Sequence, residues 1–149
     1  MTVDIYHIGP SPPCRAVRLA AKLIGVDVNL KVIDITKGEQ MTPEFLKWPL
    51  VFKVGPHDEK KFQEIPKNLP VLEKILEESE FVAGDCITVA DASIVTIISN
   101  YDMVGVDFSK YPNISRWYDK CKKVIPDYDE INQKGAEDFK KFWEHLRSL

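Results

Sequence analysis

The chain has 149 residues, of which 44% are apolar and 29% are charged, and its formal net charge at pH 7 is −3. This size and balance predict a globular protein with one domain or two small ones, and they exclude a disordered chain. Basic and acidic residues are interspersed without a basic stripe, so nucleic acid is not expected as a partner.

The cysteines and the N-terminal residues bear on the compartment. Cys14, Cys86 and Cys121 are odd in number and far apart, which argues against a disulfide framework, and the three histidines are isolated, so no metal site is predicted. The first residues lack the basic region and apolar run of a signal peptide, and no apolar stretch is long enough to span a bilayer. We therefore expect a cytoplasmic protein without membrane association.

The first 35 residues predict a strand, a helix and a second strand. Residues 2–7 alternate in polarity and favour a strand. Ser11, followed by two prolines, is typical of a helix start, and Gly25 of a helix end. Apolar residues alternate again over residues 28–35, which predicts the second strand. Together these elements form a βαβ unit, whose strands run parallel.

The helix after Ser11 is predicted to be amphipathic. Its apolar stripe consists of Val17, Ala20, Ala21 and Ile24, and the opposite side carries Arg15, Arg18 and Lys22. A short helix is then predicted over residues 42–47. The apolar residues 48–54 end at Gly55-Pro56, a boundary beyond which the pattern is helical throughout.

Four further helical stretches follow. Pro66 and Pro70 predict a kink or break in the first. Thr88 and Asp91 form a capping box that opens a helix to about Met103, which is apolar nearly all round and therefore belongs in the middle of the core. Another helix is predicted between the prolines at 112 and 126. The last is an amphipathic helix with Phe139, Phe142, Trp143 and Leu146 on its apolar face.

The turn at Ser11 is the candidate catalytic feature. A thiolate, not a thiol, is the nucleophile, and a free thiol has a pKa of about 8.5. A helix N-terminus carries partial positive charge, and a hydroxyl at that point can donate a hydrogen bond to an anion. Lowering a thiol pKa by two units takes about 2.7 kcal/mol. Ser11 is therefore placed to stabilise a thiolate, although a serine before proline can also act only as a helix cap.

Other residues have competing interpretations. Ser-Pro-Pro-Cys resembles a Cys-x-x-Cys redox motif with its first cysteine replaced, but Cys14 is better explained as a small buried residue. Thr88 and Asp91 are interpreted as structural rather than catalytic. Tyr101, Phe108 and Trp117 could line a hydrophobic substrate pocket, with core packing favoured for Trp117.

Several motifs together resemble the insect delta/epsilon-class glutathione S-transferases. They are Ser11-Pro12-Pro13-Cys14-Arg15, residues 37–46, Val82-Ala83-Gly84-Asp85, Ile87-Thr88-Val89-Ala90-Asp91 and residues 108–118. The resemblance implies a partial thioredoxin-like βαβ unit of the α/β class at residues 1–47, which would bind glutathione. It implies an all-α C-terminal domain at residues 48–149.

The same resemblance implies a function. Ser11 would be the catalytic residue, and Ser11, Pro13 and Gln40 would bind glutathione, with no metal. The reaction would conjugate the glutathione thiolate to small hydrophobic electrophiles, as in detoxification. A homodimer or other self-association is expected.

The resemblance also implies that the middle of the chain is shortened. The family's cis-proline loop, its third and fourth strands, its acidic-serine pair and the helices that follow find no counterpart between residues 47 and 48. A lone parallel strand pair has open edges, so lower stability than that of a full-length relative and self-association are expected. Two alternatives to an enzyme follow: a non-catalytic binding or assembly module, supported by residues 48–54 if exposed, and an inactive splice form.

Overall fold

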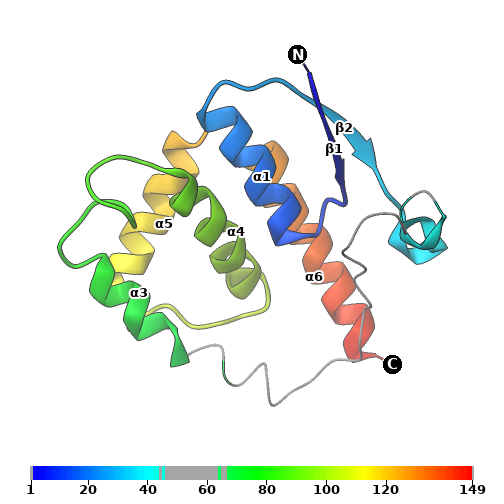
Figure 1. The fold of residues 1–149 in the computed structure, drawn as a ribbon. Helices are drawn as coiled ribbons and strands as arrows, with labels where there is room; N and C mark the ends of the chain where they lie inside the picture. Colours follow the sequence, from blue (N-terminus) through cyan, green and yellow to red (C-terminus); the bar gives the residue numbers. More distant parts are fainter. Residues whose placement is uncertain (1, 44, 46–63, 65–66, 149) are drawn as a thin grey trace.

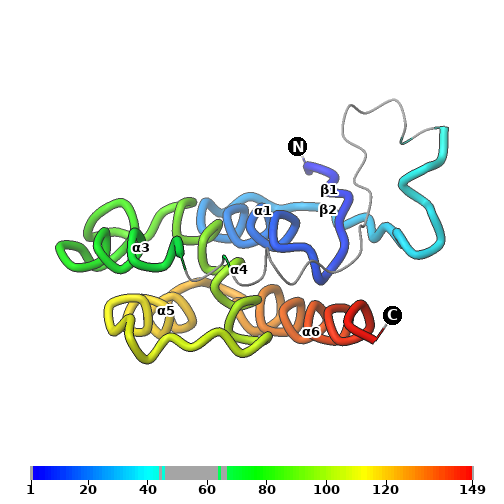
Figure 2. The backbone as a smooth tube through the Cα atoms, turned by 90° about the horizontal axis from the view of Figure 1, so that it is seen from below, coloured from blue at the N-terminus to red at the C-terminus, as the bar shows by residue number. Residues whose placement is uncertain are grey.

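The computed structural model describes residues 2–43, 45, 64 and 67–148. Strand β1 (Val3–His7), helix α1 (Pro12–Leu23) and strand β2 (Val28–Val32) come first, followed by two 3-10 turns, Ile35–Lys37 and Glu39–Met41. The helical part contains α3 (Leu69–Ile75), α4 (Val89–Met103), α5 (Pro112–Val124) and α6 (Lys134–Arg147), with a π-helical turn at Asp129–Gln133 directly before α6 (Figure 1). Figure 2 shows two rows, with α3, α1 and the strands in one and α5 and α6 in the other.

The predicted βαβ unit is present. β1 and β2 pair in parallel, from Val3 opposite Val28 to His7 opposite Val32. β2 ends three residues earlier than predicted, because the Asp34 side chain accepts hydrogen bonds from the amides of Thr36 and Lys37 and so starts a 3-10 turn. Within the described ranges the sheet has these two strands, and each has one unpaired edge.

The predicted orientation of α1 is correct only in part: Ala20 and Ala21 pack inward as expected, but Val17, Ile24 and Arg15 do not lie where the apolar stripe places them. Arg15 and Leu19 are fully buried, whereas Val17 is 52% and Ile24 65% exposed. The reason is that α1 makes its most extensive contacts with α4, which offers polar acceptors as well as apolar side chains. Arg15 therefore faces inward, on the side that hydrophobicity alone assigns to solvent.

The core is centred on α4 and α5, as the apolar α4 sequence predicts. Its capping box is formed: Thr88 Oγ1 accepts from the Ala90 amide at 3.2 Å, and the Asp91 carboxylate accepts from the Thr88 amide at 2.8 Å. The buried apolar cluster includes one residue of α1, so that a single core joins the two parts of the chain. Its buried members are Leu19, Leu69, Leu76, Phe81, Ala92, Val95, Ile98, Ile114, Trp117, Tyr118, Cys121, Ile125, Tyr128 and Ile131.

Of the predicted kink or break at the prolines, the structure shows a helix start at Pro70 and not a kink. α3 begins at Leu69, so Pro70 occupies its first turn, where its missing N–H costs no hydrogen bond. α3 also caps α5, because the Glu73 carboxylate accepts from the backbone amides of Asn113 at 3.0 Å and Ile114 at 2.9 Å. A carboxylate at a helix N-terminus is favourable to the helix dipole, and here it ties two helices together.

Other predictions fall outside the described residues. These are most of the helix expected over 42–47, the apolar residues 48–54, the boundary at residues 55–56 and the helical piece before Pro66. The domain division between residues 47 and 48 also lies there and stays a prediction. Among the helices that are described, none is long and apolar enough to cross a membrane.

Candidate active site

Ser11 lies in the turn between β1 and α1, at the carboxyl end of the sheet. Its backbone amide donates to the Ile8 carbonyl at 3.3 Å, and its extended conformation (φ −73°, ψ 118°) makes it the N-cap of α1. Ser11 Oγ accepts from the Cys14 amide at 3.4 Å, which is a long hydrogen bond. Ser11 Oγ donates to no other described residue, so its proton is available to a ligand.

The two prolines make this helix terminus unusual. Helix N-termini bind anions through backbone N–H groups that have no intrahelical partner. Pro12 and Pro13 have no N–H, the Cys14 amide is bound by Ser11 Oγ, and the Arg15 amide donates to the Ser11 carbonyl at 3.0 Å. An anion here would therefore depend on the Ser11 hydroxyl and the helix dipole, rather than on backbone donors.

Arg15 lies one turn into α1 and is completely buried. Its Nη1 donates to the carbonyl and the side-chain oxygen of Asn132, at 3.0 and 2.7 Å, and to Ser99 Oγ at 3.3 Å. Its Nη2 donates to the Thr96 carbonyl at 3.3 Å and to the side-chain oxygen of Asn100. These bonds attach α1 to α4 and to the π-helical turn.

The charge of Arg15 is balanced by dipoles. In the described part of the chain no carboxylate lies within ion-pair distance of it, and its Nε has no partner. Burial lowers the pKa of the Arg15 guanidinium to about 10, so the group keeps its proton at neutral pH. Such a group is costly to bury unless its acceptors are held in place.

The predicted glutathione-binding residues lie beyond the carboxyl ends of the two strands. Pro13 is exposed in the first turn of α1, and Gln40 lies in the 3-10 turn after β2. The Ile33 amide donates to the His7 carbonyl at 3.0 Å, which joins the carboxyl ends of the two strands. Both turns therefore follow the same end of the sheet (Figure 1). Ligands bind at this end in open α/β sheets. Gln40 Nε2 donates to the Ile35 carbonyl at 3.4 Å, and within the described residues Gln40 makes no hydrogen bond to Ser11 or Pro13.

The other candidates take structural positions. Trp117 is fully buried, and its indole N–H donates to Asp91 at 2.8 Å, which agrees with the core interpretation. Tyr101 and Phe108 are partly buried against the same core cluster. Cys14 is half-buried and free. The described residues contain no cluster of side chains suited to hold a metal ion.

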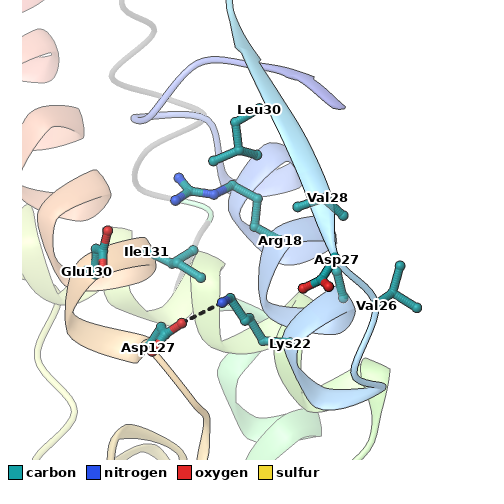
Figure 3. Close-up of a pocket in the computed structure, with 10 residues that line it drawn as sticks. Arg18, Lys22, Val26, Asp27, Val28, Leu30, Asp127, Glu130 and Ile131 are labelled. Carbon is teal, nitrogen blue, oxygen red and sulfur yellow. Dashed lines mark ion pairs between the residues drawn. The ribbon is translucent and has the colours of Figure 1, made fainter. Parts of the chain in front are cut away.

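A pocket of about 190 Å³ lies on the β2 side of α1, between that helix and the Asp127–Ile131 segment (Figure 3). Its apolar wall includes Val28 and Leu30, and an ion pair of 2.8 Å joins Lys22 to Asp127 across it. None of the predicted site residues lines this pocket. The pocket is therefore not part of the predicted glutathione site.

Sequence analysis missed Arg15 and Asn132 as supports of the Ser11 turn. One signal was present for Arg15: it precedes Leu19 by four residues and Leu23 by eight, a spacing that puts all three on one face of the helix. Asn132 carries no comparable signal, because its position depends on the π-helical turn.

Residues 41–123 match the family described as "Glutathione S-transferase, C-terminal domain". A delta-class glutathione transferase of Nilaparvata lugens superposes with a TM-score of 0.85 and 30% identity, over 96% of this chain and 99% of the other. An epsilon-class enzyme of Musca domestica gives 0.82 and 20%, covering 96% and 97%. A glutathione transferase homologue of Drosophila mojavensis with bound glutathione gives 0.79 and 18%, covering 95% and 96%.

Proposed function

Because the chain belongs to the glutathione S-transferase family, we propose that it binds glutathione at the N-terminus of α1 and conjugates the thiolate to small hydrophobic electrophiles. The predicted order of a partial βαβ unit followed by a helical transferase domain is confirmed. Glutathione is the co-substrate in this proposal, in line with the glutathione-bound homologue, and no metal takes part. A cytoplasmic role in detoxification fits the same chemistry.

The observation that supports this proposal is the state of the Ser11 hydroxyl. It lies at a helix N-terminus where Pro12 and Pro13 remove two backbone donors, and it donates to no described residue. A thiolate placed there would accept its hydrogen bond and gain from the helix dipole. Both contributions favour the thiolate over the thiol, so they lower the pKa of the bound thiol. Pro13 and Gln40 are proposed to contact the rest of glutathione.

The Ser11→Ala variant tests this proposal. Loss of one hydrogen bond to a charged group costs about 1.5–3 kcal/mol, which corresponds to a fall of about ten- to a hundredfold in kcat/KM. The conjugation of glutathione to a chlorodinitrobenzene can be followed by absorbance across a range of pH. We expect the apparent pKa of the reaction to rise by about one to two units in the variant.

A matched control is Ser93→Ala, since Ser93 is exposed on α4 and far along the chain from the turn. This variant should conjugate glutathione as the unchanged protein does. Equal rates in Ser11→Ala and Ser93→Ala would contradict a catalytic role for Ser11. A wild-type protein that is folded but has no conjugating activity would contradict the proposed reaction itself.

A non-catalytic assembly module is the second candidate, and the open sheet favours it. β1 and β2 each have an unpaired edge in the described ranges, and Val3 and Val32 are 49% and 73% exposed. Unpaired strand edges and exposed apolar residues promote association. Homodimerisation is proposed on the same ground. Sedimentation measures self-association in the wild type and in Ser11→Ala. Equal self-association of the two proteins, together with a wild type that has no conjugating activity, would favour this function.

A further inference from the structure

The C-terminal helix makes an unusually close contact with the segment around Ser11. Gly135, the second residue of α6, is buried, and a Cβ atom built on it would lie 2.6 Å from the Gly9 carbonyl oxygen and 2.4 Å from Arg15 Cδ. Both distances are shorter than van der Waals contact allows. Only a residue without a side chain therefore permits this approach of the helix backbone to the turn.

Neighbouring positions on the same side of the C-terminal segment add to the contact. Three residues before Gly135, Asn132 accepts two hydrogen bonds from Arg15, at 3.0 and 2.7 Å. Three residues after it, Asp138 faces the turn, since a Cβ on Gly9 would lie 3.8 Å from its Oδ2, an ordinary contact distance. Positions 132, 135 and 138 thus all face the chain between Gly9 and Arg15.

Ser11 lies within the segment that is held in this way. Gly9 is two residues before it, and Arg15 is four residues after it. We propose that Gly135 is a positioning residue for Ser11: the absence of a side chain at Gly135 lets α6 set the place of the Ser11 turn, and so the direction of its hydroxyl. This inference rests on the proposed function for its catalytic consequence, but the positioning itself has a readout independent of activity.

The variant Gly135→Ala gives a prediction whose sign opposes the usual rule. Alanine in place of glycine within a helix is normally stabilising. Here the new methyl group must displace the Gly9 carbonyl or the Arg15 side chain, so we expect the melting temperature to fall by several degrees. The same displacement moves Ser11 Oγ. We therefore expect kcat/KM for conjugation to fall at least about tenfold and the apparent thiol pKa in its pH profile to rise.

The cysteines report the displacement without any catalysis. Cys14 is half-buried beside Ser11, Cys121 is fully buried in α5, and exposed Cys86 is replaced by serine in all variants. We expect iodoacetamide to label Cys14 at least about threefold faster in Gly135→Ala, while Cys121 stays protected. Global unfolding would expose both thiols alike, whereas movement of the turn exposes only Cys14.

Lys140→Ala is the matched control, because it changes an exposed position of α6 and should leave labelling and pH profile unchanged. Unchanged Cys14 labelling in Gly135→Ala, or equal acceleration at Cys14 and Cys121, would overturn the inference. If wild type lacks conjugating activity, the proposed function fails and the labelling alone decides. If Gly135→Ala does not fold, Asp138→Ala decides: faster labelling of Cys14 alone supports positioning by α6, and an unchanged rate contradicts it.

Discussion

Replacement of Asp91 by alanine is expected to lower the free energy of unfolding by about 3–5 kcal/mol. The Asp91 carboxylate is fully buried and accepts from three backbone or indole N–H groups, those of Val82 at 2.9 Å, Thr88 at 2.8 Å and Trp117 at 2.8 Å. Alanine would leave the buried Trp117 indole N–H without an acceptor and would remove the acceptor of the half-buried Val82 and Thr88 amides. Urea unfolding followed by tryptophan fluorescence and by circular dichroism measures the difference.

Two milder variants separate the contributions at this site. Asp91→Asn keeps the shape but loses the charge and one acceptor oxygen, so its cost should lie between that of alanine and zero. Trp117→Phe removes the bond to Asp91 and, because its ring is smaller, a part of the packing. A loss of less than about 1 kcal/mol in Asp91→Ala would show that water replaces the carboxylate, and would contradict a stabilising role for its three hydrogen bonds.

Arg15→Ala should have an effect of similar size, about 3–5 kcal/mol, for a different reason. The change removes the largest fully buried charged side chain among the described residues and leaves acceptors on Ser99, Asn100 and Asn132 without their donor. It also removes the hydrogen bonds that tie α1 to α4 and to the π-helical turn, although the apolar packing of α1 against the core remains. Chemical denaturation at pH 7 is the appropriate measurement.

Arg15→Lys is the control for charge alone, because an ammonium cannot reach acceptors on both α4 and the π-helical turn. We expect it to recover less than half of the loss. The contribution of Arg15 should not vary between pH 5 and 9, since its folded pKa of about 10 and its still higher ordinary pKa both lie above this range. Full recovery in Arg15→Lys would contradict a role for the forked geometry.

Local signals predicted the helical half well. The Thr88–Asp91 capping box and the prolines at 112 and 126 mark boundaries through chemistry that lies within a few residues, and α4 and α5 begin where those signals place them. The end of β2 was placed too late because the Asp34 turn, although also local, competes with a continuing apolar alternation. Local signals succeed where nothing else competes for the same residues.

The surroundings of Ser11 could be predicted only in part. Its place before Pro12 and Pro13 indicates a helix start, and the structure places it there. The inward face of α1 could not be derived from hydrophobicity, because Arg15 is buried by acceptors that lie more than 80 residues away on α4. The contact at Gly135 depends equally on the packing of distant segments, which a glycine in a helical stretch does not reveal.

The most direct test of a glutathione site at Ser11 is thermal unfolding with and without glutathione, for the wild type, Ser11→Ala and Ser93→Ala. A ligand at a hundred times its dissociation constant stabilises a protein by about 2.7 kcal/mol, which is several degrees for a chain of this size. A working site predicts such a rise in wild type and Ser93→Ala, and a clearly smaller one in Ser11→Ala. A cooperative transition that glutathione does not shift, or an equal shift in all three proteins, would contradict a glutathione site built on Ser11.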